Sequence, residues 1–167
     1  MTNPPTFLSP MTSRPYPWVV GTYEAGTRNN PVLLKLQSLA RRRWGFRNLG
    51  TYVVRNMNSH SVLSTHAIPA AADQGYGNTA KERKKAIQAC TWYVEYAKEL
   101  DVVCIHDYAA VPPRAWRCDR NEWKAFPNGE LGPTYRGLHV ELGKRALAMT
   151  AKEWEAVWRS LPRPPKL

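Results

Sequence analysis

The chain has 167 residues, with 24 Lys and Arg against 13 Asp and Glu, and a formal net charge of +11 at pH 7. A hydrophobic content of 43% with seven Trp and eight Tyr excludes a disordered chain and predicts a packed globule. The three cysteines form no CxxC pair, which argues against a disulfide framework and against a cysteine zinc site. So large a positive charge indicates an anionic partner, and nucleic acid, an anionic cell wall and acidic lipid all qualify.

The chain divides into a domain with two short flanks. Residues 1–17 are rich in proline and are expected to form an arm, residues 18–161 a single domain, and residues 162–167 a tail. The first residues lack a basic start followed by an apolar core, so no signal peptide is expected, and no apolar run is long enough to span a bilayer. We therefore expect synthesis in a reducing cytoplasm.

Three helices are predicted from their end signals. Asn30 and Gly45 bound a first helix, and Thr79 with Glu82 forms a capping box before a second helix that runs to about residue 100. Thr150 and Glu153 begin a last helix, which Pro162 ends. The core stripes are expected to be Val32, Leu36 and Leu39 in the first helix, Ile87, Cys90, Val94 and Ala97 in the second, and Trp154, Val157, Trp158 and Leu161 in the last.

Strands are predicted at 50–54, 61–65, 101–107 and 138–142, from their β-branched, aromatic and apolar residues. Residues 111–137 are interpreted as a long ordered loop, rich in Pro, Gly and Trp. Because helices and strands do not alternate regularly, the order favours an α+β domain with a mainly antiparallel sheet flanked by helices.

The four histidines differ in their surroundings. His60 lies in a polar turn and His106 at the end of a strand, where a structural role is expected. His139 alternates with Leu138 and Val140, so its ring shares a strand face with Glu141. Together with His66 and Asp73 it offers two imidazoles and one carboxylate, which suit a zinc ion with one position open for water. The alternative is three unrelated polar residues.

The stretch SVLSTHAIPAAAD resembles the zinc-ligand motif of the D-Ala-D-Ala carboxypeptidase and L-alanoyl-D-glutamate endopeptidase family, Ser-x-His-x-x-Gly-x-Ala-x-Asp. Ser64, His66, Ala71 and Asp73 match it at the right spacing. LHVEL resembles the second signature, a His in a short strand near the C-terminus, with His139 as third ligand. The resemblance covers about residues 44–142 and is closest to versions found in phages of actinobacteria.

This resemblance implies a hedgehog/DD-peptidase-like fold and a zinc metallopeptidase that cleaves the peptide stems of bacterial peptidoglycan, as a phage lysin or a virion-associated wall hydrolase. It implies that His66, Asp73 and His139 bind Zn²⁺ and that Ser64 contacts the substrate. Arg55 is a candidate for stabilising the oxyanion at the scissile carbonyl; a solvated turn residue is the other interpretation. The implied partners are peptidoglycan or an anionic wall polymer, and phage structural proteins.

Two positions depart from the family pattern. Pro69 replaces the motif glycine, so the turn between the first two ligands must be built differently. Arg136 stands three residues before His139, where the family has an acid, and an arginine cannot accept a proton. The general base is therefore expected to be Glu130, with Glu141 as the other candidate, and Arg136 is assigned to substrate binding.

Two further hypotheses belong to other classes. The departures favour a catalytically impaired structural or wall-binding module, such as a phage tail component, that keeps the fold and the metal site. The segments RRRWGFRN and KERKK suggest nucleic-acid binding as another hypothesis. No standard nucleic-acid motif is present, so nucleic acid is not the expected partner.

Overall fold

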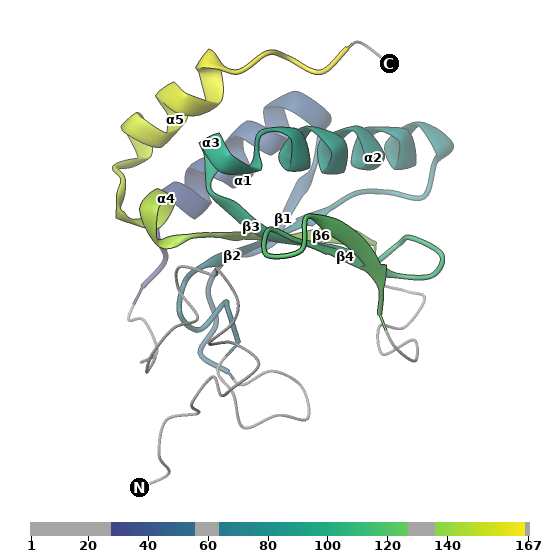
Figure 1. Cartoon of the computed structure of the whole chain (residues 1–167), viewed down its shortest axis with the longest axis horizontal. Helices are drawn as coiled ribbons and strands as arrows, with labels where there is room; N and C mark the ends of the chain where they lie inside the picture. The colour runs from purple at the N-terminus through teal and green to yellow at the C-terminus, as the bar shows by residue number, and fades with distance from the viewer. Residues whose placement is uncertain (1–27, 56–63, 127–135, 166–167) are drawn as a thin grey trace, which may run out of the picture.

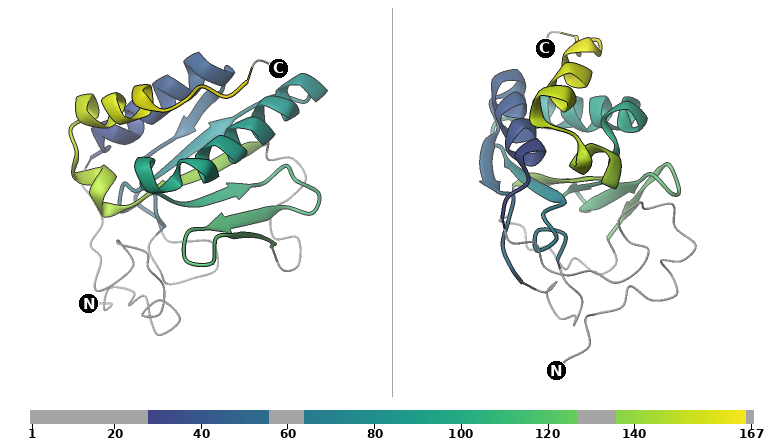
Figure 2. Two further views of the ribbon diagram at one scale, coloured as in Figure 1. Left: turned by 45° about the horizontal axis from the view of Figure 1, so that its top comes forward. Right: turned by 90° about the vertical axis from the view of Figure 1, so that its left-hand side faces the viewer.

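The computed structural model describes residues 28–55, 64–126 and 136–165. These residues form an α+β fold around one six-stranded antiparallel sheet, in the strand order β1-β2-β6-β3-β4-β5. The helices lie over one face of this sheet (Figure 1 and Figure 2). The α+β class predicted from the sequence is thereby confirmed. No helix in the described ranges is long and apolar enough to cross a membrane.

Three of the helices begin directly after the predicted cap residues Asn30, Thr79 and Thr150. The helices are α1 (Pro31–Trp44), α2 (Ala80–Glu95), α3 (Ala97–Leu100), α4 (Lys144–Ala148) and α5 (Ala151–Ser160). The strands are β1 (Arg47–Gly50), β2 (Ala71–Gly75), β3 (Val102–Asp107), β4 (Arg114–Arg117), β5 (Glu122–Ala125) and β6 (Gly137–Leu142). Both predicted capping boxes are present, at Thr79 for α2 and at Thr150 for α5, because each threonine side chain accepts a bond that the first helical turn leaves open.

The hydrophobic core lies between the helices and the sheet. Its centre is an aromatic cluster in which the rings of Trp92 and Trp158 lie 4.5 Å apart between centroids, with Trp44 5.8 Å from each. Leu33 and Leu36 of α1 are fully buried beside it. Aromatic side chains carry the largest apolar area per residue, so this cluster accounts for much of the packing of α1, α2 and α5 on one another.

The central strand β6 is buried on both faces. Leu138, Val140 and Leu142 belong to the core beneath the helices. The intervening His139 and Glu141 point to the opposite face, and both are buried as well. The strand alternation predicted from the sequence is confirmed, and it sets two polar side chains on the face of the sheet away from the helices.

Two predicted strands are wrong in position. Residues 51–54 are not in a strand, and the strand here is β1, which ends at Gly50. Val53 and Val54 are 44% and 59% exposed, because their β-branched side chains have no neighbouring strand to pack against. The predicted strand at 61–65 falls partly on residues 61–63, outside the described ranges. Ser64 is not in a strand, and Thr65 begins a turn over 65–69.

Four elements were not expected from the sequence: β2, β4, β5 and α4. The strand β2 has the sequence AADQG, which lacks β-branched and aromatic residues, and it exists because β1 and β6 pair with its two edges. The long loop at 111–137 contains the hairpin of β4 and β5, in which Trp116 pairs with Trp123. The short helix α4 lies between β6 and α5.

Of the predicted core stripe of the second helix, Cys90 is fully buried, Val94 and Ala97 are partly buried, and Ile87 is exposed. Ile87 is 43% exposed, while Ala86, Ala89, Cys90 and Tyr93 are buried. The small alanines let α2 approach the core closely, so the buried face of the helix is turned away from Ile87. The helix also ends earlier than predicted, at Glu95, and α3 follows after Tyr96.

Candidate metal centre

A tight turn at residues 65–69 carries His66 to the sheet. The amide of Ala70 donates to the carbonyl of Thr65 at 2.9 Å, and the amide of Ala67 donates to the carbonyl of Ser64 at 2.8 Å. No residue of this turn has a positive φ. The turn therefore accommodates Pro69, whose ring fixes a negative φ, where a glycine was expected. His66 lies in the first half of this turn and is only 3% exposed.

The pairing of β2 with β6 brings the other two residues together. Asp73 of β2 lies directly opposite His139 of β6 in the antiparallel register. The amide of Gln37, from α1, donates to the backbone carbonyl of Asp73 at 2.7 Å and holds this part of β2 in place. Side chains directly opposite each other on neighbouring strands are close enough for contact, so the ladder itself places the two residues.

The carboxylate of Asp73 contacts both histidines. Its Oδ1 lies 2.8 Å from Nδ1 of His139, and its Oδ2 lies 3.1 Å from Nε2 of His66. The two imidazole rings stand edge to face, with 4.9 Å between their centroids. One ligand atom from each of the three residues lies within 4.8 Å of the others. His66, Asp73 and His139 are thus positioned to bind a metal ion.

The second nitrogen of His139 is held on the other side of the ring. Its Nε2 lies 3.0 Å from Oε1 of Glu141 and 3.2 Å from the hydroxyl of Thr65. A histidine that binds a metal through one nitrogen commonly donates its other N–H to a carboxylate, which fixes the ring and its tautomer. Glu141 is placed for this orienting role, and its contact lies on the ring edge away from Asp73.

Hydrogen bonds in this cluster outweigh the effect of burial on two pKa values. Burial alone would raise the pKa of Asp73, but hydrogen bonds with His139 and His66 hold it well below its usual range. Burial alone would lower the pKa of His139, but hydrogen bonds with Asp73 and Glu141 raise it to about 10. The two carboxylates therefore stay ionised and favour a cation between them, whether a protonated ring or a metal ion.

The donor set and spacing suit a small divalent ion. Ligand atoms around a tetrahedral zinc stand about 3.3 Å apart, given Zn–N and Zn–O bonds of about 2.0–2.1 Å. The contacts of Asp73 with the histidines, at 2.8 and 3.1 Å, differ from this by only a few tenths of an ångström. The three residues leave a fourth tetrahedral position for another ligand, which is the arrangement of catalytic sites.

The remaining predicted site residues are placed differently. Ser64 is buried, and its hydroxyl accepts from the amide of His66 at 3.3 Å. The carbonyl of Arg55 accepts from the amide of Ser64 at 3.0 Å, and Arg55 is exposed. Arg136 is exposed and precedes β6, with its carbonyl accepting from the amide of Tyr76 at 3.3 Å. Glu130 lies outside the described residues.

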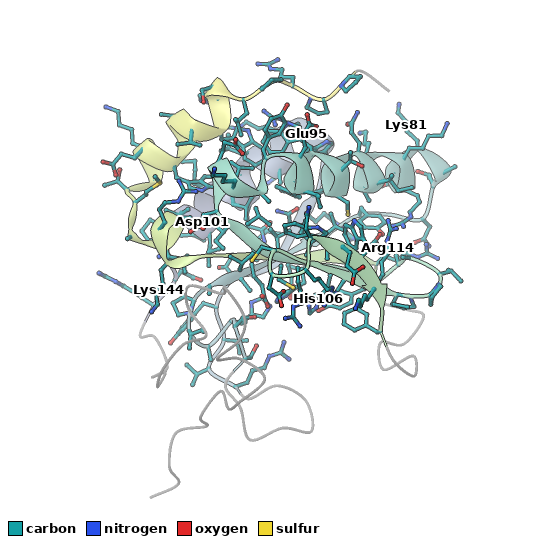
Figure 3. All side chains as sticks on the ribbon, in the orientation of Figure 1. Lys81, Glu95, Asp101, His106, Arg114 and Lys144 are labelled. Atoms are coloured by element: carbon teal, nitrogen blue, oxygen red, sulfur yellow. The ribbon has the colours of Figure 1, made fainter. Side chains whose placement is uncertain are left out.

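The strand β3 adds side chains to the same face of the sheet. His106 lies opposite His139 in the ladder between β3 and β6, with 4.9 Å between ring centroids, and on the face away from the helices (Figure 3). Burial and the nearby His139 together lower its pKa to about 3, so the ring is neutral near pH 7. Ligand atoms of Cys104, His106 and Glu141 also lie within 4.8 Å of one another.

The position of His106 at a strand end predicts a structural role and gives no link with His139. Nothing in the local sequence reveals this proximity, since it depends on which strands pair. Glu141 could be found from the sequence, because strand alternation puts it on the face of His139.

Comparison of the chain with protein-family models, with curated proteins and with solved structures gives no match. The interpretation of the centre therefore depends on its geometry and on the two sequence motifs.

Proposed function

We propose that this chain is a zinc-dependent peptidase that cleaves the peptide stems of bacterial peptidoglycan, as a phage lysin or a virion-associated wall hydrolase. The observation that carries the proposal is the convergence of His66, Asp73 and His139, with His139 oriented by Glu141. Two imidazoles and one carboxylate with an open position form a donor set for catalytic zinc. When bound there, zinc would activate a water molecule and polarise a peptide carbonyl.

The protein's own groups would orient the ligands and the substrate. Asp73 and Glu141 hold opposite nitrogens of His139, so the ring cannot rotate away. We assign Ser64 to substrate contact. The bond between the Arg55 carbonyl and the Ser64 amide keeps Arg55 beside the motif, which supports a role for its guanidinium in stabilising the oxyanion.

We assign the general base to Glu130, because Glu141 is engaged with His139 on the ring edge away from Asp73. A base must reach the proton that it accepts, and Glu141 is directed elsewhere. Arg136 is exposed, and its planar guanidinium suits recognition of a substrate carboxylate.

Metal analysis and a cleavage assay test the proposal together. We expect the purified protein to hold one zinc per chain and to release fragments from purified peptidoglycan stem peptides, measured by mass spectrometry. His66→Ala should lose both zinc and cleavage, whereas Glu130→Gln should keep zinc and lose cleavage. Glu122→Gln, on the exposed strand β5, is the control. A folded, zinc-loaded protein that leaves all stem peptides intact would disprove the peptidase proposal.

A second candidate function is a wall-binding module that keeps the metal centre without turnover. It is favoured by Arg136 at the position of the family's acid, and by the engagement of both nearby carboxylates. Among the described residues, Asp73 and Glu141 are the carboxylates in contact with His66 and His139. This candidate predicts that the wild-type protein sediments with intact cell walls and does not cleave them.

A further inference from the structure

Two basic segments that are far apart in the sequence meet on the helical side of the molecule. The segment 41–43 (RRR) lies in the last turn of α1, and the segment 81–85 (KERKK) lies in the first turns of α2. Arg42 and Arg43 from the first segment line a cavity of about 640 Å³ together with Lys81 and Lys85 from the second. Arg159 of α5 and Arg163 of the C-terminal segment complete the cationic lining, and no Asp or Glu of the described residues takes part in it. We call this cavity the basic cleft.

Most of these charges have no ion pair. Glu155 lies 2.6 Å from Arg159 and 3.8 Å from Arg42, and it also pairs with Lys35. Within the described part of the chain, the other four cations of the cleft form no ion pair with a carboxylate: Arg43, Lys81, Lys85 and Arg163. Four like charges around one hollow repel one another, so an anion bound among them lowers the electrostatic energy.

Arg43 gives the cleft a fixed charge. The central carbon of its guanidinium lies 4.3 Å from the ring centroid of Trp92 and 4.4 Å from that of Trp158. Its Nη1 is shielded from solvent and has no hydrogen-bond partner among the described residues. Stacking on two indoles holds the guanidinium rigidly, and a buried donor without an acceptor is a cost that a bound anion would relieve.

The C-terminal segment is held so that Arg163 faces the cleft. The indole of Trp92 donates to the carbonyl of Pro162 at 2.8 Å, and the amide of Gln88 donates to the carbonyl of Pro165 at 2.6 Å. These two bonds tie both ends of the segment 162–165 to α2. The basic cleft is therefore built from α1, α2, α5 and this segment, and it does not depend on one flexible side chain.

The chemistry of the cleft favours a phosphodiester chain without bases. Binding of single-stranded nucleic acid requires aromatic faces on which bases stack. The indoles in the cleft lining, Trp44 and Trp158, are 3% and 2% exposed, and Arg43 already stacks on Trp158. Point charges such as Lys81 and Lys85 suffice for a polyol phosphate, whose anionic groups recur along a flexible chain.

We infer that the basic cleft binds a phosphodiester polymer that carries no bases, of the polyol-phosphate kind found in bacterial walls. The choice of a wall polymer depends on the proposed function, whereas the anionic ligand class depends on the cleft alone. Lys81 lies on the helical side and His106 on the opposite side of the sheet (Figure 3). The bound polymer is thus an anchor, distinct from the peptide at the metal centre.

Isothermal titration with purified glycerol-phosphate polymer tests the inference. The cleft variant carries Lys81→Ser, Lys85→Ser and Arg163→Ser. The matched control carries Lys98→Ser, Lys144→Ser and Lys152→Ser, which removes the same charge from exposed positions outside the cleft lining. Circular dichroism checks that both variants are folded. We expect the cleft variant to bind about tenfold more weakly or worse. The slope of log binding constant against log salt concentration should fall by about 2, because three phosphate contacts are lost and each releases about 0.7 counterion. We expect the control to bind within about twofold of wild type.

Each outcome decides one part of the inference. Equal weakening in both variants would show that net charge alone attracts the polymer, and would overturn the assignment of the basic cleft as its binding site. If single-stranded DNA binds more tightly than a glycerol-phosphate polymer with the same number of phosphates, the ligand of the cleft is a nucleic acid and not a wall polymer. Because binding is measured without hydrolysis, and can be repeated after chelation, a protein that binds the polymer but cuts no peptide would refute the proposed function and leave this inference standing.

Discussion

His139 shows how a single residue can take its role from two contacts. Its Nδ1 faces Asp73 at 2.8 Å and its Nε2 faces Glu141 at 3.0 Å. The two ring nitrogens of histidine are chemically distinct, and the hydrogen bond made by one sets what the other can do. Without a metal the ring is protonated and both nitrogens donate to carboxylates. A metal at Nδ1 would displace the proton there, and Glu141 accepting at Nε2 would keep the other proton in place.

Glu141→Gln tests this orienting contact. We expect zinc affinity to fall about 10- to 100-fold, because the neutral amide holds the ring less firmly and no longer favours its N–H. The measurement is a competition titration with a zinc-binding dye, with Glu122→Gln as control. Unchanged affinity would mean that Glu141 does not orient His139. Complete loss of binding would mean instead that Glu141 is itself a ligand.

At the scale of the elements, α2 is attached to the sheet by a charged contact as well as by its apolar face. Arg83 of α2 donates to both oxygens of Asp107 in β3, at 2.7 and 2.9 Å. Asp107 is fully buried, and Arg114 of β4 lies 3.5 Å from it as a second cation. A bidentate pair of this kind fixes the orientation of a helix on a strand more sharply than apolar packing does.

Arg83→Met should lower the free energy of unfolding by about 3 kcal/mol, because it leaves a buried carboxylate without its main partner. The value lies at the lower end of the range for such pairs, since Arg114 remains in place. Denaturant titration measures the change. Lys84→Met, the next residue of α2 and an exposed one, is the control and should change the stability by less than about 0.5 kcal/mol. A loss below about 1 kcal/mol for Arg83→Met would show that the pair adds little.

At the scale of the whole molecule, the metal centre joins parts that are distant along the chain. His66 comes from a turn, Asp73 from β2 and His139 from β6, and the two strands are neighbours in the sheet. The hydrophobic core lies on the helical face, whereas these polar side chains gather on the other face. An ion bound to all three residues would therefore tie together the face that the core does not reach.

Zinc should stabilise the folded chain by mass action, because the unfolded chain does not hold the three ligands together. At a free zinc concentration 100 times the dissociation constant, we expect about 2.7 kcal/mol of added stability. Thermal unfolding with zinc and with a chelator measures it, and Asp73→Asn should remove most of the difference. Equal melting temperatures in zinc and in chelator would contradict binding at this centre.

Local signals in the sequence predict the elements that depend on local interactions. The caps Asn30, Thr79 and Thr150 mark the starts of α1, α2 and α5, since a capping side chain and the amide that it satisfies are only two or three residues apart. The apolar strand β3 and the alternating strand β6 were found from their side-chain patterns. The strand β2 was not, because alanine, aspartate, glutamine and glycine have little strand preference of their own.

The candidate site divides in the same way. The resemblance of the segment with Ser64, His66 and Asp73 to a family motif, with His139 in a short alternating strand, predicted the candidate ligand set from the sequence. Only the tertiary structure decided that Asp73 lies opposite His139, that His106 lies on the other side of His139, and that Glu141 occupies its second nitrogen. These relations depend on the order and register of strands far apart in the sequence, which local patterns do not encode. The basic cleft has the same origin, because packing of α1, α2 and α5 brings separate charged segments to one place.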